Sequence, residues 1–412
     1  MNDNEYVLGV DIGGTFTDLL LLEKNTGKMK ILKVSSTPSD PSEGVLIGVN
    51  TILKEEKLDP QSINLVIHGS TVAINTVIEK KGANTGLLTT TGFKDILYIG
   101  RQNRPSLFHY RLKRPEPLVS RDKIKEMSER VLYNGEIHEK LDKPSAKILI
   151  NDLKKTNVDA VAICLIHSYA NPSHELELKE LVKESIGNAY LSVSSELLPE
   201  YREFERMNTT VMNAYIGPKV SKYIKKLENG LKSLNLNKLL IMQANGGVMS
   251  PEAVLPRPIN IIESGPAGGV LAASYVAKLT GRNKIISFDM GGTTAKTCLV
   301  QDYKPFLSST YEVLSSESGD SLVIGSGYPL KIPVMDMYEV GAGGGSIGWI
   351  DEGGALRVGP KSAGADPGPA CYAKGGKNPT ITDANLILGR LNPDYFLGGK
   401  LKLDVKLAKS AF

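Results

Sequence analysis

The sequence predicts an α/β protein built from two related domains that face a shared cleft. The first observation is the segment VLGVDIGGTFTDLLLLE at residues 7–23, where two apolar runs flank a Gly-Gly pair and two threonines. The second is IISFDMGGTTAKTCLV at residues 285–300, in which Asp289 and the glycines after it repeat the pattern of Asp11 and its neighbours 278 positions later. A motif that recurs once at so long a distance indicates two related domains, because solenoid repeats recur every few tens of residues. Domain interfaces are a favoured place for ligand sites.

Each of the two segments is predicted to form a β-hairpin with a polar tip. Glycine has no Cβ, so the chain can reverse tightly and its backbone N–H groups can approach an anion such as a phosphate group. The candidate phosphate contacts are glycines and threonines at the two tips, namely Gly13, Gly14, Thr15, Thr17, Gly291, Gly292, Thr293 and Thr294. Asp11 and Asp289 precede the tips, where a carboxylate can meet a phosphate-bound Mg²⁺, usually through water. Asp18 is a secondary candidate, with turn capping as its alternative. For the first segment alone, an ordinary hairpin with Gly-Gly at its turn is the alternative.

The first domain is predicted to comprise residues 1–199. A helix is expected after the first hairpin, starting near Ser39 or Ser42 and directing Val45 and Ile52 toward the core. Strands with helical patterns beside them are expected at LVIHGS (65–70), GLLTT (86–90) and VDAVAICLI (158–166). This alternation is typical of a sheet covered by helices.

The second domain is predicted to comprise residues 200–412. Residues 200–234 are predicted to be mainly helical and to connect the two domains, and strand patterns return from residue 238. The Gly- and Pro-rich stretch 341–376 is predicted to form loops and turns whose backbone approaches other groups closely. Apolar residues such as Trp349 are interspersed in this stretch, which favours a packed meander over a low-complexity linker.

The composition indicates an ordinary globular protein. The 412 residues include 41% hydrophobic and 23% charged residues, and a net charge of +4 is too small to argue for a nucleic-acid partner. Cys164, Cys298 and Cys371 are isolated and lack CxxC spacing, which argues against a disulfide framework or a zinc site. The N-terminus lacks a signal-peptide pattern, and no apolar run approaches the roughly 18 residues that span a bilayer. We therefore expect a cytoplasmic protein without a membrane partner.

Two familiar catalytic patterns are not supported by the rest of the sequence. Residues 344–348 match the G-x-S-x-G pattern of hydrolases, but that fold places its histidine after the serine. The five histidines all precede Ser346: His68, His109, His138, His167 and His174. No Gly-Lys pair is followed by Ser or Thr, so the sequence has no P-loop. Any phosphate chemistry therefore depends on the two hairpins.

Several polar residues are candidates for substrate contacts. His68 and His167 each follow an apolar strand, and the carboxyl ends of strands are where α/β proteins place ligands. Each could act as an acid or base or contact the substrate, and a hydrogen-bonded histidine beside a turn is the alternative. Arg101, Gln102 and Arg104 lie in YIGRQNRP and could reach an anionic or amide-bearing substrate, since Arg binds carboxylates bidentately. An exposed polar loop is the alternative for this segment.

The duplicated hairpin resembles the phosphate-binding device of the actin, sugar kinase and Hsp70 superfamily. This resemblance implies two related actin/Hsp70-like (ribonuclease H-like) ATPase domains around a nucleotide cleft. It implies ATP and Mg²⁺ (or Mn²⁺) as cofactors, with phosphates held at the two tips. Asp11 and Asp289 would then be metal-binding and catalytic residues, and His68 a further catalytic candidate.

Longer stretches of the chain are similar to the hydantoinase A and 5-oxoprolinase family. In the first half they are VDIGGTFTD, HGSTVAINTVIEKKGANTGLLTTTGFKDILYIGRQNRP and SSELLPEYREFERMNTTVMNAYIGP. In the second half they include QANGGVMS, ESGPAGGVLAA, FDMGGTTAK, VGAGGGSI and VGPKSAGADPGPACY. The resemblance implies an ATP-dependent hydrolase that opens a cyclic amide ring, a hydantoin or 5-oxoproline, through a phosphorylated carbonyl. It also implies an oligomer with a hydantoinase B type subunit as partner.

Two departures from the family pattern widen the range of expected functions. Members of the family generally continue for several hundred residues beyond the stretch RLNPDYFLGG, so the second domain is expected to be truncated. Ala295 and Lys296 stand where many relatives have Thr-Asp, a version associated with hydantoinase and ketone carboxylase branches. The alternatives are the ATP-using β subunit of a ketone (acetone) carboxylase, a sugar kinase, and a non-catalytic Hsp70-like ATP-binding regulator.

Overall fold

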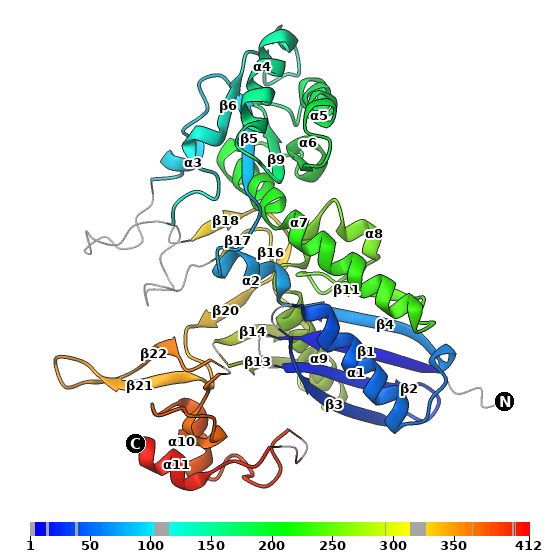
Figure 1. Ribbon diagram of the computed structural model, residues 1–412, viewed down its shortest axis with the longest axis vertical. Helices are drawn as coiled ribbons and strands as arrows, with labels where there is room; N and C mark the ends of the chain where they lie inside the picture. The colour runs from blue at the N-terminus through cyan, green and yellow to red at the C-terminus, as the bar shows by residue number, and fades with distance from the viewer. Residues whose placement is uncertain are drawn as a thin grey trace.

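The structure is a computed structural model with a mixed α/β fold. It describes residues 5–13, 16–37, 40–102, 115–292, 294–313, 327–364, 366–397, 399 and 401–412. Figure 1 shows two sheets joined by a long green helix, with the C-terminal segments below them. Both hairpins predicted from the sequence are present, and each pairs two antiparallel strands.

The first sheet has six strands and contains the first hairpin. Its spatial order is β12-β11-β4-β1-β2-β3. The strands are β1 (Tyr6–Ile12), β2 (Phe16–Glu23), β3 (Met29–Ser35), β4 (Ile63–Ser70), β11 (Leu239–Met242) and β12 (Val248–Met249). β1 pairs with β2 in antiparallel fashion and with β4 in parallel, so the hairpin stands in the middle of the sheet. The sheet takes β11 and β12 from beyond residue 199, and the domain boundary expected there stays a prediction.

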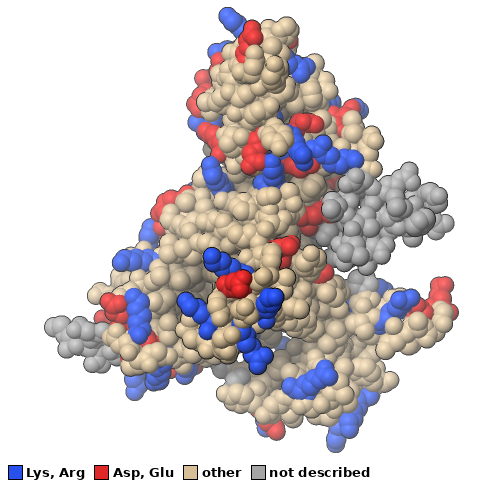
Figure 2. All heavy atoms as spheres, turned by 180° about the vertical axis from the view of Figure 1, so that it is seen from behind, with Lys and Arg blue, Asp and Glu red and all other residues tan. Residues whose placement is uncertain are grey.

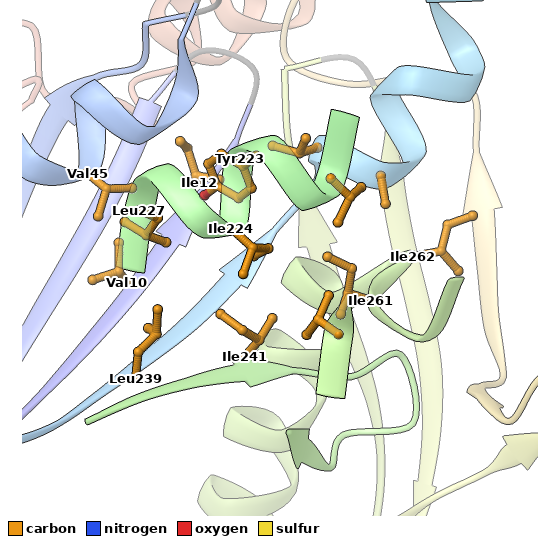
Figure 3. Packing of buried hydrophobic residues seen from close by; sticks show 14 of the residues in the cluster. Val10, Ile12, Val45, Tyr223, Ile224, Leu227, Leu239, Ile241, Ile261 and Ile262 are labelled. Atoms are coloured by element: carbon orange, nitrogen blue, oxygen red, sulfur yellow. The ribbon is translucent and has the colours of Figure 1, made fainter. Parts of the chain in front are cut away.

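Two long helices cover one face of this sheet. They are α1 (Pro41–Glu55) and α7 (Glu203–Ser233), and the short helices α2 (Val72–Ile78) and α8 (Pro251–Val254) lie nearby. α1 begins between the two serines expected to start it, and the side chain of Asp40 caps it by accepting a hydrogen bond from the Ser42 N–H at 3.1 Å. Figure 3 shows Val10 of β1 beside Leu227 of α7 and Ile12 of β1 beside Tyr223 of α7, all within one buried cluster. Successive side chains of a strand point to opposite faces of the sheet. Because Val10 and Ile12 point toward the covering helices, Asp11 between them points to the other face.

The second sheet has four parallel strands in the order β10-β9-β5-β6. They are β5 (Thr85–Thr90), β6 (Ile124–Met127), β9 (Ala160–Cys164) and β10 (Tyr190–Val193). The helices of this part are α3 (Ile96–Ile99), α4 (Lys143–Lys154), α5 (Ser173–Ser185) and α6 (Ser194–Leu197), and a small ladder joins β7 (Arg130–Val131) to β8 (Ile137–Glu139). All five residues of β9 are buried, as expected for a parallel sheet that is covered on both faces.

Helix α7 packs against both sheets. Its first half contributes Met207 and Val211 to the core that contains Leu87 of β5. Its second half contributes Ile224 and Leu227 to the core of the first sheet. The helix predicted over residues 200–234 is therefore confirmed, and it joins the two sheets of the first 250 residues as one continuous element.

The third sheet contains the second hairpin. It is formed by β13 (Lys284–Met290), β14 (Ala295–Gln301), β15 (Lys304–Pro305) and β20 (Met337–Val340), and α9 (Ser264–Leu279) packs against β13 and β14. The remaining strand pairs are β16 (Leu307–Ser308) with β19 (Val334–Met335), β17 (Tyr311–Val313) with β18 (Tyr328–Leu330), and β21 (Ser346–Ile350) with β22 (Leu356–Ser362). The chain continues through α10 (Ile381–Ile387) and α11 (Val405–Ala411). The Gly-rich stretch thus forms strands and loops, including the β21–β22 hairpin, as its interspersed apolar residues predict.

The three cysteines, Cys164, Cys298 and Cys371, are buried free thiols. Within the described ranges, none of the helices is both long and apolar enough to cross a bilayer. On the face that Figure 2 shows, blue and red side chains are interspersed over the upper part of the molecule.

Candidate functional site

The two hairpins have the same backbone geometry at their tips. In the first, the Gly13 N–H donates to the Phe16 carbonyl oxygen at 2.9 Å. In the second, the Gly291 N–H donates to the Thr294 carbonyl oxygen, also at 2.9 Å. The strand registers match as well, since Ile12 lies opposite Thr17 and Met290 lies opposite Ala295. The repeat of 278 positions seen in the sequence is therefore a repeat in three dimensions.

Helix α9 brings the aspartates of the two hairpins into one site. A Cβ on Gly265 would lie 2.9 Å from Oδ1 of Asp11, and a Cβ on Gly269 would lie 3.6 Å from Oδ2 of Asp289. These glycines are four residues apart, so they share one face of the helix. Gly69, at the end of β4, closes the site from another side, because its Cβ would lie 3.1 Å from the same Asp11 oxygen. Asp11 and Asp289 thus line opposite ends of a glycine surface.

The start of α9 is bonded to the strand ends beside it. The Ser264 hydroxyl donates to the Ser70 carbonyl oxygen at 3.0 Å and accepts from the Ser70 N–H at 3.1 Å. The Thr71 hydroxyl donates to the carbonyl oxygen of Ile12 at 3.1 Å. The Ser264 bonds hold the first turn of α9 against the end of β4, and the Thr71 bond ties the residue that follows β4 to the end of β1. The positive end of the helix dipole consequently lies beside the Asp11 carboxylate.

Asp11 lies in an unfavourable environment for a negative charge. Its pKa is raised to about 6, first by the loss of hydration where protein atoms crowd the carboxylate, then by the negative charges of Asp18 and Asp289. Lys33 opposes this effect, and it also forms an ion pair with Asp18 at 2.5 Å. A carboxylate of this kind is suited to bind a cation or to accept a proton near neutral pH.

The surroundings of Asp289 differ, because Lys296 takes the place that corresponds to Asp18. Asp289 lies opposite Lys296 in the β13–β14 ladder. The Lys296 ammonium forms an ion pair with Glu263, which is buried, and the Tyr311 hydroxyl donates to the same carboxylate at 2.9 Å. Burial and the charge of Glu263 raise the pKa of the nearby Glu339. The second hairpin therefore carries a buried charged cluster that the first lacks at the equivalent position.

The Gly-rich loop 341–346 is hydrogen-bonded through its backbone to the tip of the second hairpin. The Gly344 N–H donates to the Gly291 carbonyl oxygen at 2.9 Å, and the Gly345 N–H donates to that of Gly292 at 2.7 Å. A Cβ on Gly345 would lie 3.0 Å from the Gly292 oxygen, so a larger residue would push the two loops apart. Ser346 is buried and its hydroxyl accepts from the Gly343 N–H at 2.9 Å. This environment agrees with the exclusion of a nucleophile elbow.

His68 is fully buried and both of its ring nitrogens are hydrogen-bonded. Nδ1 lies 3.2 Å from the Val10 carbonyl oxygen, and Nε2 lies 2.5 Å from the Tyr223 hydroxyl. Burial lowers the pKa of His68 to about 4, so the ring is neutral, with Nδ1–H as donor and Nε2 as acceptor. This arrangement favours a structural role over the catalytic role expected from the sequence.

The structure describes Thr17, Arg101 and Gln102 among the other predicted site residues. Thr17 is buried and its hydroxyl lies 3.1 Å from that of Ser36, so this side chain stabilises the hairpin and does not face solvent. Arg101 forms a two-bond ion pair with Glu205 at the start of α7, with distances of 2.8 and 2.5 Å. Gln102 follows it with a positive φ of 58°. Gly14, Thr15, Thr293 and Arg104 lie outside the described residues. The substrate role of the arginine loop stays a prediction.

Sequence reasoning did not identify the residues of α9 as part of the site. Glu263, Ser264, Gly265 and Gly269 lie in the stretch ESGPAGG, which carries part of the family resemblance. The available signal was the spacing of two glycines within a helical segment. Glycine costs about 1 kcal/mol relative to alanine inside a helix, so its presence there indicates a close approach.

The residues at this site could hold a magnesium ion that is also bound to nucleotide phosphates. Mg²⁺ in nucleotide sites is held by one or two carboxylates together with substrate phosphates and water. Asp11 and Asp289 supply two carboxylates, and the described ranges contain no group of three or more His, Cys, Asp or Glu that could hold a metal ion. The mutual repulsion of the carboxylates at Asp11 is what a cation would relieve. Asp11 and Asp289 are thus the residues that would hold the ion.

Comparison with protein families divides the chain into two matched regions. Residues 7–186 match the hydantoinase/oxoprolinase N-terminal region, and residues 206–412 match hydantoinase/oxoprolinase. An uncharacterized protein from Methanocaldococcus jannaschii is 43% identical over 98% of this chain and 60% of its own length. Caprolactamase subunit alpha from Pseudomonas jessenii is 35% identical over 100% of this chain and 58% of its own length.

Two solved structures share the fold. The nucleotide-free structure of acetone carboxylase matches with a TM-score of 0.82 and 27% identity, covering 99% of this chain and 58% of that chain. The structure of ATP-dependent caprolactamase from Pseudomonas jessenii matches with a TM-score of 0.79 and 34% identity, covering 98% of this chain and 58% of that one. The chain therefore spans about three fifths of the length of these relatives. The two family matches, over residues 7–186 and 206–412, and the shared fold establish that this chain belongs to the hydantoinase/oxoprolinase family.

Proposed function

We propose that this chain is the hydantoinase A type subunit of an ATP-dependent hydrolase that opens a cyclic amide ring, a hydantoin or 5-oxoproline. The observation that carries the proposal is the pairing of Asp11 and Asp289 by one glycine face of α9. Such a site suits phosphates and a divalent cation. The relationship to an ATP-dependent caprolactamase, an enzyme named for a cyclic amide, supports this substrate class.

The finer interpretation of the fold is part of this proposal. The matching tips and registers of the two hairpins support two related actin/Hsp70-like domains around a nucleotide cleft. Mg²⁺, the cytoplasmic location and a hydantoinase B type partner belong to the same proposal, and the name of the caprolactamase relative as a subunit supports a partner chain.

The reaction would activate a poor electrophile. An amide carbonyl resists attack because its nitrogen donates electrons, and phosphorylation of the amide oxygen removes that resistance. Transfer of the γ-phosphoryl group of ATP to this oxygen releases ADP. Water then adds to the ring carbon and the C–N bond breaks, which leaves an acyl phosphate that a second water hydrolyses. The products are ADP, phosphate and the ring-opened acid.

The residues of this chain have distinct roles in that scheme. Backbone N–H groups at the two tips would surround the phosphates, whereas those of Gly13 and Gly291 close the hairpins by donating to Phe16 and Thr294. Asp11 is mostly ionised at neutral pH with a pKa of about 6, so it can hold the cation or accept a proton from water. The positive end of α9 would stabilise negative charge that develops during phosphoryl transfer.

A ketone carboxylase is the second candidate function. The structural similarity to acetone carboxylase favours it, as does Lys296 in place of the aspartate expected in many relatives. ATP use in either chemistry would need a site for phosphates and a cation, and the described residues fit both.

The deciding experiment measures ADP release by the complex reconstituted with a hydantoinase B type subunit. The panel would contain 5-oxoproline, hydantoins, caprolactam, and acetone plus bicarbonate. We expect stimulation by one or more cyclic amides. Stimulation by acetone with bicarbonate alone would assign the carboxylase function. No stimulation by any member of the panel would favour an ATP-binding regulator.

A further inference from the structure

The outer face of the third sheet is apolar and exposed. On the three strands β13, β14 and β20 this face carries Ile286, Phe288, Met290, Leu299, Tyr338 and Val340, whose exposed fractions lie between 41% and 71%. Helix α9 covers the other face, where Ala267 and Val270 pack against Cys298 and Val300. An exposed apolar sheet face of this kind indicates an interaction surface.

The duplication shows what this face corresponds to in the first sheet. Shifted by 278 positions, Ile286, Phe288 and Met290 of β13 correspond to Leu8, Val10 and Ile12 of β1. These three residues of β1 are at most 4% exposed. The same face of the first sheet is therefore the inside of a domain.

The neighbouring strands repeat this relationship. Leu299 of β14 corresponds by the same shift to Leu21 of β2, which is buried. Tyr338 pairs with Thr297 as Leu32 of β3 pairs with Leu19, and Leu32 is buried too. The correspondence thus extends over three strands of each sheet.

The first sheet has elements for which the third sheet shows no counterpart within the described part of the chain. In the first sheet, α1 and α7 cover this face, and β4 pairs in parallel with the outer edge of β1. In the third sheet, β13 is an edge strand. An open strand edge beside an apolar face is a template for strand addition.

We propose that this face and the β13 edge bind the polypeptide that corresponds to the part of the longer relatives that this chain does not match. That polypeptide would add a strand parallel to β13, as β4 does to β1, and lay the apolar side of one or two helices on Phe288 and its neighbours. The relatives contain the necessary sequence, because this chain spans only 60% and 58% of two of them. The inference rests on the proposed two-domain fold and not on cyclic amide chemistry.

The experiment combines this chain with the unmatched part of the Methanocaldococcus jannaschii relative, expressed as a separate polypeptide. Sedimentation would measure complex formation, and hydrogen exchange would locate it. We expect a one-to-one complex in which the amides of β13 gain protection. Absence of a complex, or protection that omits β13, would overturn the proposal.

Two matched substitutions distinguish specific binding at this surface from nonspecific hydrophobic association. Ile286 on β13 and Ile31 on β3 are both 71% exposed isoleucines on strands. We expect Ile286→Glu to weaken the complex at least 100-fold and Ile31→Glu to leave it unchanged. Equal effects of the two variants would overturn the assignment. Self-association of the chain alone that Ile286→Glu abolishes would assign the face to a second copy instead.

The surface and the proposed function can fail independently. A stable complex that protects β13 but shows no ADP release with any cyclic amide would preserve the surface and remove the hydrolase function. ADP release that depends on a cyclic amide, without protection of β13, would preserve the hydrolase function and remove the proposed surface.

Discussion

Asp11 and Asp18 lie directly opposite each other in the β1–β2 ladder, with Lys33 paired to Asp18 from the next strand. Two carboxylates at opposed positions repel each other, and this repulsion adds to the partial loss of hydration that raises the pKa of Asp11 to about 6. In the second hairpin, Lys296 lies opposite Asp289. The two aspartates of the duplicated motif are therefore electrostatically unequal, which suits different roles in one site.

The first prediction concerns the pH dependence of ATP turnover. If Asp11 must be ionised to act, the rate should rise with pH through an apparent pKa near 6. Asp18→Asn removes one of the charges that raise this pKa, so the rising limb should move to lower pH. The pH profile of kcat/KM for the reconstituted complex checks this. An unmoved limb in Asp18→Asn would show that another group controls the profile.

The second prediction is that Asp11→Asn loses turnover and gains stability. Loss of a carboxylate that organises the cation should reduce the rate by about 100-fold or more. Because the pKa of Asp11 is raised in the folded state, its ionised form opposes folding, fully above pH 6 and progressively less as the pH falls toward 4. Although protein atoms crowd its carboxylate, Asp11 as a whole residue is exposed, and solvent screens part of the effect, so the gain should be roughly 1 kcal/mol or less.

Thermal unfolding of Asp11→Asn at pH 8 and pH 4 measures that gain. A higher melting temperature at pH 8 that disappears at pH 4 is the expected result. Reduced stability at both pH values would mean that the asparagine disturbs the site and that the lost turnover carries no information about the carboxylate.

Local sequence patterns predicted most of the strands and both hairpins, whereas long-range partners could not be predicted. Alternating apolar residues and glycine pairs are signals within a few residues, and they located β1 and β13 together with Asp11 and Asp289. The partner of His68 is Tyr223, on a helix that starts more than a hundred residues later, and no local pattern indicates this pairing. The same holds for Arg101 and Glu205. The catalytic role expected for His68 from its place at a strand end stays a prediction.

The third prediction tests the glycine surface of α9. Gly265→Ala would place a methyl group 2.9 Å from Oδ1 of Asp11, so Asp11 or the helix must move. We expect a loss of turnover of at least tenfold. Gly268→Ala on the same helix is the control, because its nearest neighbours are the flexible Met242 side-chain atoms at 4.0 Å. Alanine is the better helix former by about 0.5–1 kcal/mol, so the control should be neutral or stabilising. Equal turnover in both variants would contradict the close approach to Asp11.

The fourth prediction distinguishes a structural from a catalytic His68. Tyr223→Phe removes the hydroxyl that donates to Nε2 and leaves a buried acceptor without its partner. Such a loss costs about 1–3 kcal/mol of folding free energy. We expect denaturant unfolding to show this cost while ATP turnover at 25 °C changes less than threefold. Lost turnover with unchanged stability would restore His68 as a catalytic candidate.

The fifth prediction concerns the buried ion pair of Lys296 and Glu263 behind the second hairpin. Lys296→Met leaves the Glu263 carboxylate buried without its ion-pair partner, although the Tyr311 hydroxyl still donates to it, and removal of one partner of a buried pair costs about 3–5 kcal/mol. Adding Glu263→Gln to the same chain removes the negative charge that Lys296→Met leaves buried and unpaired. The double variant should therefore recover much of the stability of the parent. A double-mutant cycle by denaturant unfolding measures the coupling, and single losses that simply add would show that the two side chains act independently. Because Glu263 immediately precedes Ser264 and Gly265, the double variant should nevertheless turn over ATP more slowly than the parent if this pair positions the start of α9 against Asp11.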